Sequence, residues 1–269
     1  MTLIPVDGCD LFVTEVGAGP PALVMHGGLG LDHTYLSPGL DALGKHRRLY
    51  YYDHRGNGRS GRPSMETFTL SQMAADADAL REAIGVNRIS VIGHSYGGFV
   101  ALEYGVTYPE RIDKLVLFDT APAGDYLDEL TANAIARGAK GEILRMLESV
   151  PETDEEFSKL WFALAPLYFA NYDAGQFAEV MRRTIYCAAA GNASYERWTE
   201  WSVVDRLNHV TASTLVLVGR HDWITPPGQA ERIALGIPSA ELVIFEDAGH
   251  FPWLEDPNAL SVVNTFLAR

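Results

Sequence analysis

The chain has 269 residues, of which 47% are hydrophobic and 21% are charged, a balance that excludes a disordered protein. Its 35 acidic residues outnumber its 21 basic residues, and the formal net charge of −14 argues against nucleic-acid and membrane-surface roles. No apolar run approaches the roughly 20 residues that span a bilayer. Residues 1–10 lack the basic start and apolar core of a signal peptide, so we expect a cytoplasmic globular protein.

Short apolar runs, rich in β-branched or aromatic residues and bounded by Gly, Asp or Pro, predict buried strands. In chain order these runs are Leu11–Val16, Ala22–Met25, Arg48–Tyr52, Ile89–Ile92, Lys114–Phe118, Thr214–Val218 and Leu242–Phe245. From Leu70 to Ile84, apolar residues recur at three- and four-residue steps, which predicts an amphipathic helix. Strands that alternate with helices predict an α/β fold with a mostly parallel sheet covered on both faces.

Residues 121–208 break this alternation, because they show no strand pattern and are helical in character and rich in aromatic residues. We therefore expect residues 1–120 and 209–269 to form one core domain, with residues 121–208 inserted as a helical cap. If the cap covers the carboxyl edge of the sheet, some of its aromatic residues line an apolar pocket for the substrate. The candidates for substrate contact are Leu29, Trp161, Tyr168, Tyr186, Trp198 and Trp223.

The most informative motif is Gly93–Gly97, which reads Gly-His-Ser-Tyr-Gly and matches G-x-S-x-G. A serine on a sharp turn from strand to helix needs small neighbours, because its backbone is strained and crowded. The predicted strand Ile89–Ile92 precedes the motif and a helical run, Phe99–Tyr108, follows it. This context predicts that Ser95 is a catalytic nucleophile whose oxygen projects above the sheet.

A serine nucleophile needs a base and the base needs an orienting acid, which in this architecture follow in the order Ser, Asp or Glu, His. The histidines that follow the serine are His209, His221 and His250. His250 lies in a loop directly after the strand Leu242–Phe245, so we take it as the base. For the acid we rank Asp222 first, because it directly follows a strand, with Asp119 second and Asp247 third.

Acyl transfer also needs N–H donors for the negative carbonyl oxygen that develops in the transition state. One donor is expected to be the backbone N–H of Tyr96, which follows the nucleophile. The other is expected from the glycine-rich loop His26–Gly30, where we choose the N–H of Gly28 because glycines let the backbone approach a substrate. We expect His26 to hold this loop by hydrogen bonding.

Together these residues resemble the α/β-hydrolase superfamily, and the matching motifs run from His26 to His250. The segments His26–Gly30 and Tyr52–Ser60 are similar to those of its proline-iminopeptidase branch. The resemblance implies a core sheet of about eight strands and a helical cap. It also implies a catalytic triad and two oxyanion donors, formed by Ser95, Asp222 and His250 and by Gly28 and Tyr96.

Two residues depart from the peptidase branch: Leu29 stands where proline is usual, and Tyr96 stands where tryptophan is usual. That branch also holds the free amine of its substrate with cap glutamates, and Glu196 does not have the expected spacing. We therefore expect a cofactor-independent serine hydrolase of carboxylic esters or lactones, with N-acyl-homoserine lactones among the candidates. The alternatives are a proline-iminopeptidase-type aminopeptidase and a ligand receptor on a hydrolase fold.

Other motifs argue against cofactors and metals. Gly56–Gly61 fits G-x-G-x-x-G and Asp76 follows it, but the next helix begins only near Thr69, too far away to receive a pyrophosphate. The sequence has no H-E-x-x-H and no paired cysteines, so no metal site is expected. Cys9 and Cys187 are too few for a disulfide framework, and two buried thiols are favoured over one bridge. The expected partner is a small-molecule ester or lactone.

Overall fold

The computed structural model describes residues 1–28 and 30–269, except for the side chains of residues 38, 127, 194–196 and 198. Its described strands form one eight-stranded sheet in the order β1-β2-β4-β3-β5-β6-β7-β8. Pairing is parallel from β4 through β8 and antiparallel for β1 with β2 and β2 with β4. The strands are β1 (Thr2–Val6), β2 (Cys9–Gly17), β3 (Pro21–Met25), β4 (Arg48–Tyr52), β5 (Ile89–His94), β6 (Ile112–Phe118), β7 (Ser213–Gly219) and β8 (Ala240–Phe245).

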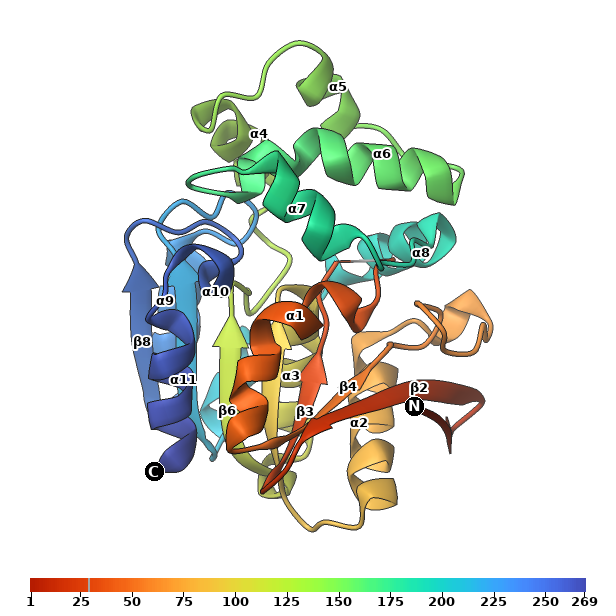
Figure 1. Cartoon of the computed structure of the whole chain (residues 1–269), viewed down its shortest axis with the longest axis vertical. Coiled ribbons are helices and arrows are strands. Elements are labelled where there is room, and N and C mark those ends of the chain that lie inside the picture. The colour runs from red at the N-terminus through yellow and green to blue at the C-terminus, as the bar shows by residue number, and fades with distance from the viewer. Residues whose placement is uncertain (29) are drawn as a thin grey trace.

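The predicted fold class, a mostly parallel α/β sheet with helices on both faces, is confirmed (Figure 1). Each predicted strand overlaps an observed one, and the predicted bounds of β4 match the observed bounds. Strand β1 was not predicted, although the chain carries a signal for it. Asp7 and Gly8 form a two-residue loop between the paired residues Val6 and Cys9, and Gly8 has a φ of 67°. Asp-Gly between two apolar runs is a strong hairpin signal.

Helices cover both faces of the sheet and bury one apolar cluster on each. Helices α2 (Leu70–Ile84), α3 (Tyr96–Thr107) and α9 (Pro227–Gly236) share a cluster with one face. Helices α1 (Ser37–Leu40) and α11 (Ala259–Ala268) share a cluster with the other, and α10 (Pro252–Glu255) leads into α11. The short 3₁₀ turns are η1 (His33–Tyr35), η2 (Asp41–Lys45), η3 (Met65–Thr67), η4 (Pro109–Arg111), η5 (Ala165–Tyr168) and η6 (Val204–His209).

The segment between β6 and β7 holds five further helices, of which α4 to α7 gather in green at the top of Figure 1. They are α4 (Leu127–Ala136), α5 (Glu142–Leu147), α6 (Asp154–Leu164), α7 (Ala174–Met181) and α8 (Ala188–Trp198). The two ends of this segment are joined by an antiparallel bridge between Ala123 and Ser202. Backbone hydrogen bonds from Gly124 to Trp201 and from Val203 to Pro122, both 2.9 Å, flank the bridge. We call this bridged region the neck.

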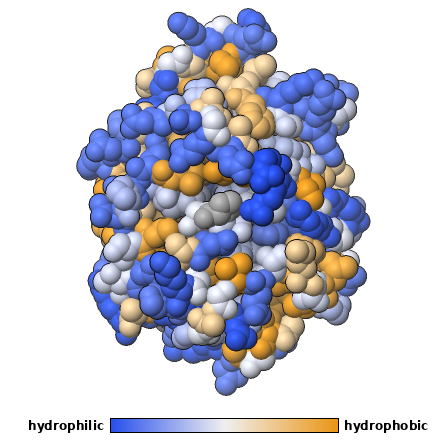
Figure 2. Space-filling view, in the orientation of Figure 1, coloured by the Kyte–Doolittle hydropathy of each residue, from blue (hydrophilic) through white to orange (hydrophobic). Residues whose placement is uncertain are grey.

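The division into a core of residues 1–120 and 209–269 and a cap of residues 121–208 stays a prediction. Cys9 and Cys187 are free thiols, as favoured, but both are half-buried and not buried as expected. Cys9 is partly exposed because it opens β2 beside the exposed hairpin loop. None of the described helices is long and apolar enough to cross a membrane. On the face drawn in Figure 2, hydrophilic residues divide the hydrophobic ones into separate patches.

Candidate active site

Ser95 lies at the turn between β5 and α3, in a backbone conformation that non-glycine residues rarely adopt (φ 54°, ψ −120°). The flanking glycines are required because the surrounding backbone leaves no room for a side chain. A Cβ on Gly97 would lie 2.1 Å from the carbonyl oxygen of Met25, and a Cβ on Gly93 would lie 2.6 Å from the carbonyl oxygen of Gly97. The Ser95 N–H donates to the carbonyl of Phe118 at 2.9 Å, which ties the turn to β6. This strained, crowded turn is the geometry that the G-x-S-x-G motif predicts.

The predicted base and acid meet in the structure. His250 and Asp222 are buried in the loops after β8 and β7, and the Nδ1 atom of His250 lies 2.8 Å from Oδ2 of Asp222. The other oxygen, Oδ1, accepts the backbone N–H groups of Ile224 (3.0 Å) and Thr225 (3.1 Å). Oδ2 also accepts the Thr225 hydroxyl at 2.7 Å. These three donors and Nδ1–H of His250 together fill the four acceptor sites of the Asp222 carboxylate. The carboxylate therefore holds the imidazole in the tautomer in which Nδ1 is the donor and Nε2 is the acceptor.

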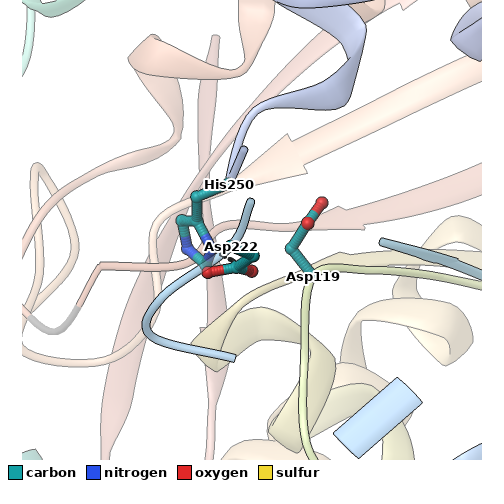
Figure 3. Close-up of side chains that lie close together, drawn as sticks. All are labelled: Asp119, Asp222 and His250. Carbon is teal, nitrogen blue, oxygen red and sulfur yellow. Dashed lines mark hydrogen bonds and ion pairs between the residues drawn. The ribbon is translucent and has the colours of Figure 1, made fainter. Parts of the chain in front are cut away.

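The two lower-ranked acids occupy different environments. Asp119 directly follows β6 with a φ of 46°, is fully buried, and accepts the N–H of Gly219 at 3.0 Å. Ligand-type atoms of Asp119, Asp222 and His250 all lie within 4.8 Å of one another, with Asp222 between the other two in Figure 3. Burial, together with the charge of Asp222, raises the pKa of Asp119 well above its usual value, which favours its protonated form. Asp247 is exposed.

Ser95 and His250 line a pocket of about 550 Å³, and three of the predicted contact residues line it with them. Trp161 stacks on Tyr168 at 5.3 Å between ring centroids, and Tyr168 meets Trp223 at 5.4 Å and His250 at 5.3 Å. These aromatic rings form a wall that ends at the base. The backbone carbonyl of Tyr168 also accepts the His250 N–H at 2.7 Å, which fixes the loop of the base.

The remaining predicted contacts have other outcomes. Tyr186 is not among the described residues that line the pocket; it packs instead against Phe157, which does line it, at 6.3 Å between ring centroids. Leu29 and the side chain of Trp198 lie outside the described residues.

Sequence reasoning missed much of the pocket wall. The unpredicted lining residues include Phe99, Tyr126, Leu130, Met146, Leu147, Phe157, Leu160 and Leu164. On α6, Phe157, Leu160, Trp161 and Leu164 recur at three- and four-residue steps, so helical periodicity could have grouped them. Glu148 carries the only carboxylate among the described lining residues, and none of those residues is Lys or Arg.

The predicted oxyanion donors belong to residues that line the same pocket as Ser95. Gly28 has a φ of 64°, and Tyr96 is the first residue of α3. His26 anchors the loop: its Nδ1 lies 2.9 Å from the carbonyl of Gly27, and its Nε2 accepts the backbone N–H of His54 at 3.0 Å. Burial lowers the pKa of His26, which favours the neutral ring that this pattern needs.

The G-x-G-x-x-G segment has a structural role. Asp76, the acid that a dinucleotide site would use, forms a buried, two-pronged ion pair with Arg55 (Nη2 to Oδ1 2.6 Å, Nε to Oδ2 2.7 Å). Gly30 in the oxyanion loop donates its N–H to Oδ1 of Asn57 at 3.1 Å. The segment after β4 therefore supports the candidate oxyanion loop.

Comparison with known proteins places the chain in a family. Residues 20–257 match the model of the alpha/beta hydrolase fold family. The proline iminopeptidase PfmaB of Pestalotiopsis fici is 30% identical over 259 residues, which cover 92% of each chain. Two solved structures share the fold: the enol-lactonase from Burkholderia xenovorans LB400 (TM-score 0.79, 24% identity, 100% of each chain covered) and an esterase from Exiguobacterium antarcticum (TM-score 0.77, 22% identity, 99% of this chain and 97% of that chain covered).

Proposed function

Because the chain belongs to the alpha/beta hydrolase fold family, we propose that it is a serine hydrolase that cleaves neutral carboxylic esters or lactones. One observation carries the proposal: Ser95 and His250 line one pocket, and the imidazole of His250 is held by the buried carboxylate of Asp222. A nucleophile, a base and an orienting acid are the parts that acyl transfer needs.

In the proposed mechanism, Nε2 of His250 takes the hydroxyl proton of Ser95 as the serine oxygen attacks the ester carbonyl. The backbone N–H groups of Gly28 and Tyr96 hold the oxyanion, and Asp222 stabilises the imidazolium. The imidazolium then protonates the leaving alkoxide, and an acyl-enzyme remains. His250 next activates a water molecule, which cleaves the acyl-enzyme and regenerates the serine.

The pocket supports a neutral, apolar acyl group. Its described lining includes the aromatic wall and the apolar face of α6, with no Lys or Arg to pair with a substrate carboxylate. Burying an anionic chain there without a partner would cost more than the apolar contacts return. Alkyl esters and N-acyl-homoserine lactones both meet this requirement.

A side-by-side rate panel tests the proposal. We expect p-nitrophenyl esters or acyl-homoserine lactones to be turned over many times per enzyme molecule, and prolyl p-nitroanilide slowly. Ser95→Ala is expected to abolish turnover. A dominant rate on the anilide would favour the peptidase, and one bound ligand without repeated turnover would favour a receptor.

The second candidate, an aminopeptidase for N-terminal proline, is favoured by one observation: Glu148 places a carboxylate at the pocket, where it could receive a free amine. Relatives that are named proline iminopeptidases support the same candidate. The Glu148→Gln variant separates the two functions, with Glu142→Gln, an exposed acid on α5, as the matched control. If the protein is an esterase, Glu148→Gln should hydrolyse neutral esters as fast as the wild type. If it is a peptidase, Glu148→Gln should lose its rate on prolyl p-nitroanilide.

A further inference from the structure

A buried chain of three hydrogen bonds connects the loops that surround Ser95. The backbone N–H of Gly27 donates to the Tyr35 hydroxyl at 2.6 Å, and that hydroxyl lies 2.7 Å from Nδ1 of His94. The other ring nitrogen of His94, Nε2, lies 2.9 Å from the backbone carbonyl oxygen of His250. Tyr35 and His94 are each about 2% exposed. The chain therefore runs from the candidate oxyanion loop, past the nucleophile, to the base.

The hydrogens in this chain have one consistent arrangement. The Gly27 N–H can only donate, so the Tyr35 oxygen accepts from it and has its own hydrogen left for Nδ1 of His94. With Nδ1 as an acceptor, the hydrogen of a neutral imidazole lies on Nε2, where the His250 carbonyl accepts it. Burial lowers the pKa of His94 well below its usual value, so the neutral ring is the stable form.

We propose that Tyr35 and His94 are positioning residues, which hold the oxyanion loop and the loop of His250 at a fixed spacing on either side of Ser95. The proposal rests on the proposed function. Both ends of the chain bond backbone groups next to reacting atoms: Gly27 precedes the oxyanion residue Gly28, and the carbonyl belongs to the base itself.

The packing around Ser95 shows why the spacing matters. A Cβ on Gly27 would lie 2.6 Å from the carbonyl oxygen of His94 and 2.6 Å from Cβ of Ser95, so the oxyanion loop already touches the nucleophile. The ring of His94 packs against the ring of His250 at 4.7 Å between centroids. A small shift of either loop therefore changes the relation of the donors and the base to Ser95, and such shifts reduce rates more than they reduce binding.

The test is Tyr35→Phe, which keeps the ring and its edge contact with Phe251 but removes the hydroxyl. We expect kcat on a p-nitrophenyl ester to fall by about 10- to 100-fold, with KM changed by less than about twofold. The matched control is Tyr51→Phe, because Tyr51 is fully buried and its hydroxyl donates to Asp41 at 2.9 Å, away from the pocket. The control should keep kcat within about twofold of the wild-type value.

Two further measurements separate positioning from loss of stability. A trifluoromethyl ketone that adds to Ser95 forms a tetrahedral oxyanion, so its affinity should fall in parallel with kcat in Tyr35→Phe. His94→Leu breaks the same chain, and the double variant should be no slower than the slower single variant. If Tyr35→Phe unfolds, His94→Leu alone carries the test, with folding checked by urea titration.

Equal kcat in Tyr35→Phe and Tyr51→Phe, or additive losses in the double variant, would overturn the positioning proposal while the proposed function stands. Full activity of Ser95→Ala would instead overturn the proposed function. The two failures are therefore distinguishable.

Discussion

The Asp222→Asn variant replaces one oxygen of a carboxylate whose acceptor sites are all occupied. The backbone N–H groups of Ile224 and Thr225 bond Oδ1 at 3.0 and 3.1 Å, and only an oxygen can accept them. The asparagine oxygen must therefore take this place, and its NH₂ group then faces Nδ1 of His250. The ring becomes an acceptor at Nδ1 and carries its hydrogen on Nε2, where it cannot take the proton of Ser95.

The wrong tautomer has a known cost in serine hydrolases, about 10⁴-fold in kcat. That factor corresponds to about 5.4 kcal/mol in the activation free energy. We expect a loss of this size for Asp222→Asn, with little change in KM, in a steady-state assay with p-nitrophenyl butyrate at neutral pH. Asp247→Asn, an exposed acid three residues before the base, is the matched control and should retain wild-type kcat.

A kcat of Asp222→Asn within about tenfold of the wild-type value would refute this reasoning, because the orientation of the amide would then not determine the tautomer. The Asp119→Asn/Asp222→Asn double variant identifies the reason. If Asp119 had replaced the missing carboxylate, the double variant would lose the residual activity.

Three predictions concern stability, each measured by urea unfolding with tryptophan fluorescence. Asp76→Leu leaves Arg55 buried without its partner and should reduce the free energy of unfolding by about 3–5 kcal/mol. The Arg55→Met/Asp76→Leu double variant should be much closer to the wild type, and an equal loss in the single and the double variant would contradict this. Gly97→Ala should cost about 1–3 kcal/mol, because its Cβ would lie 2.1 Å from the backbone oxygen of Met25; a loss under about 1 kcal/mol would contradict it. Burial lowers the pKa of His54 well below 6.5, so the unfolded chain binds a proton that the folded one does not, and stability falls as the pH drops below about 6.5. His54→Gln should reduce that slope by up to about 1.4 kcal/mol per pH unit, and an unchanged slope would contradict the assignment.

Hydrophobic periodicity located most of the core, because buried strands and amphipathic helices leave local patterns. Helix α2 and strand β4 have the predicted bounds. Strand β1 was missed because three of its five residues are exposed and the other two are only half-buried, so its apolar pattern is weak, and only the Asp-Gly loop marks it. Helix α3 begins at Tyr96, three residues before the predicted run, since the helix starts directly at the nucleophile turn.

The same difference between local and long-range information decides which residues of the candidate site could be predicted. Ser95, Asp222 and His250 could be nominated from a local motif and the order of strands. The role of His94 could not be predicted from the sequence, and its contacts show why. Its partners lie 59 residues away, at Tyr35, and 156 residues away, at His250. The position of Tyr186 also depends on helix packing, which no local pattern specifies.

The neck has a consequence for how the protein could change. The helices α4 to α8 leave the sheet after β6 and return before β7, and these two strands are neighbours. Since the bridge between Ala123 and Ser202 closes the segment on itself, its ends are held together whatever lies between them. A different set of helices could therefore be grafted between these two residues while Ser95 stays at its turn after β5, provided that the graft also supplies the carbonyl with which Tyr168 holds the N–H of His250. Most of the described pocket wall would then change with the graft, whereas Phe99, Trp223 and the candidate triad would stay with the sheet.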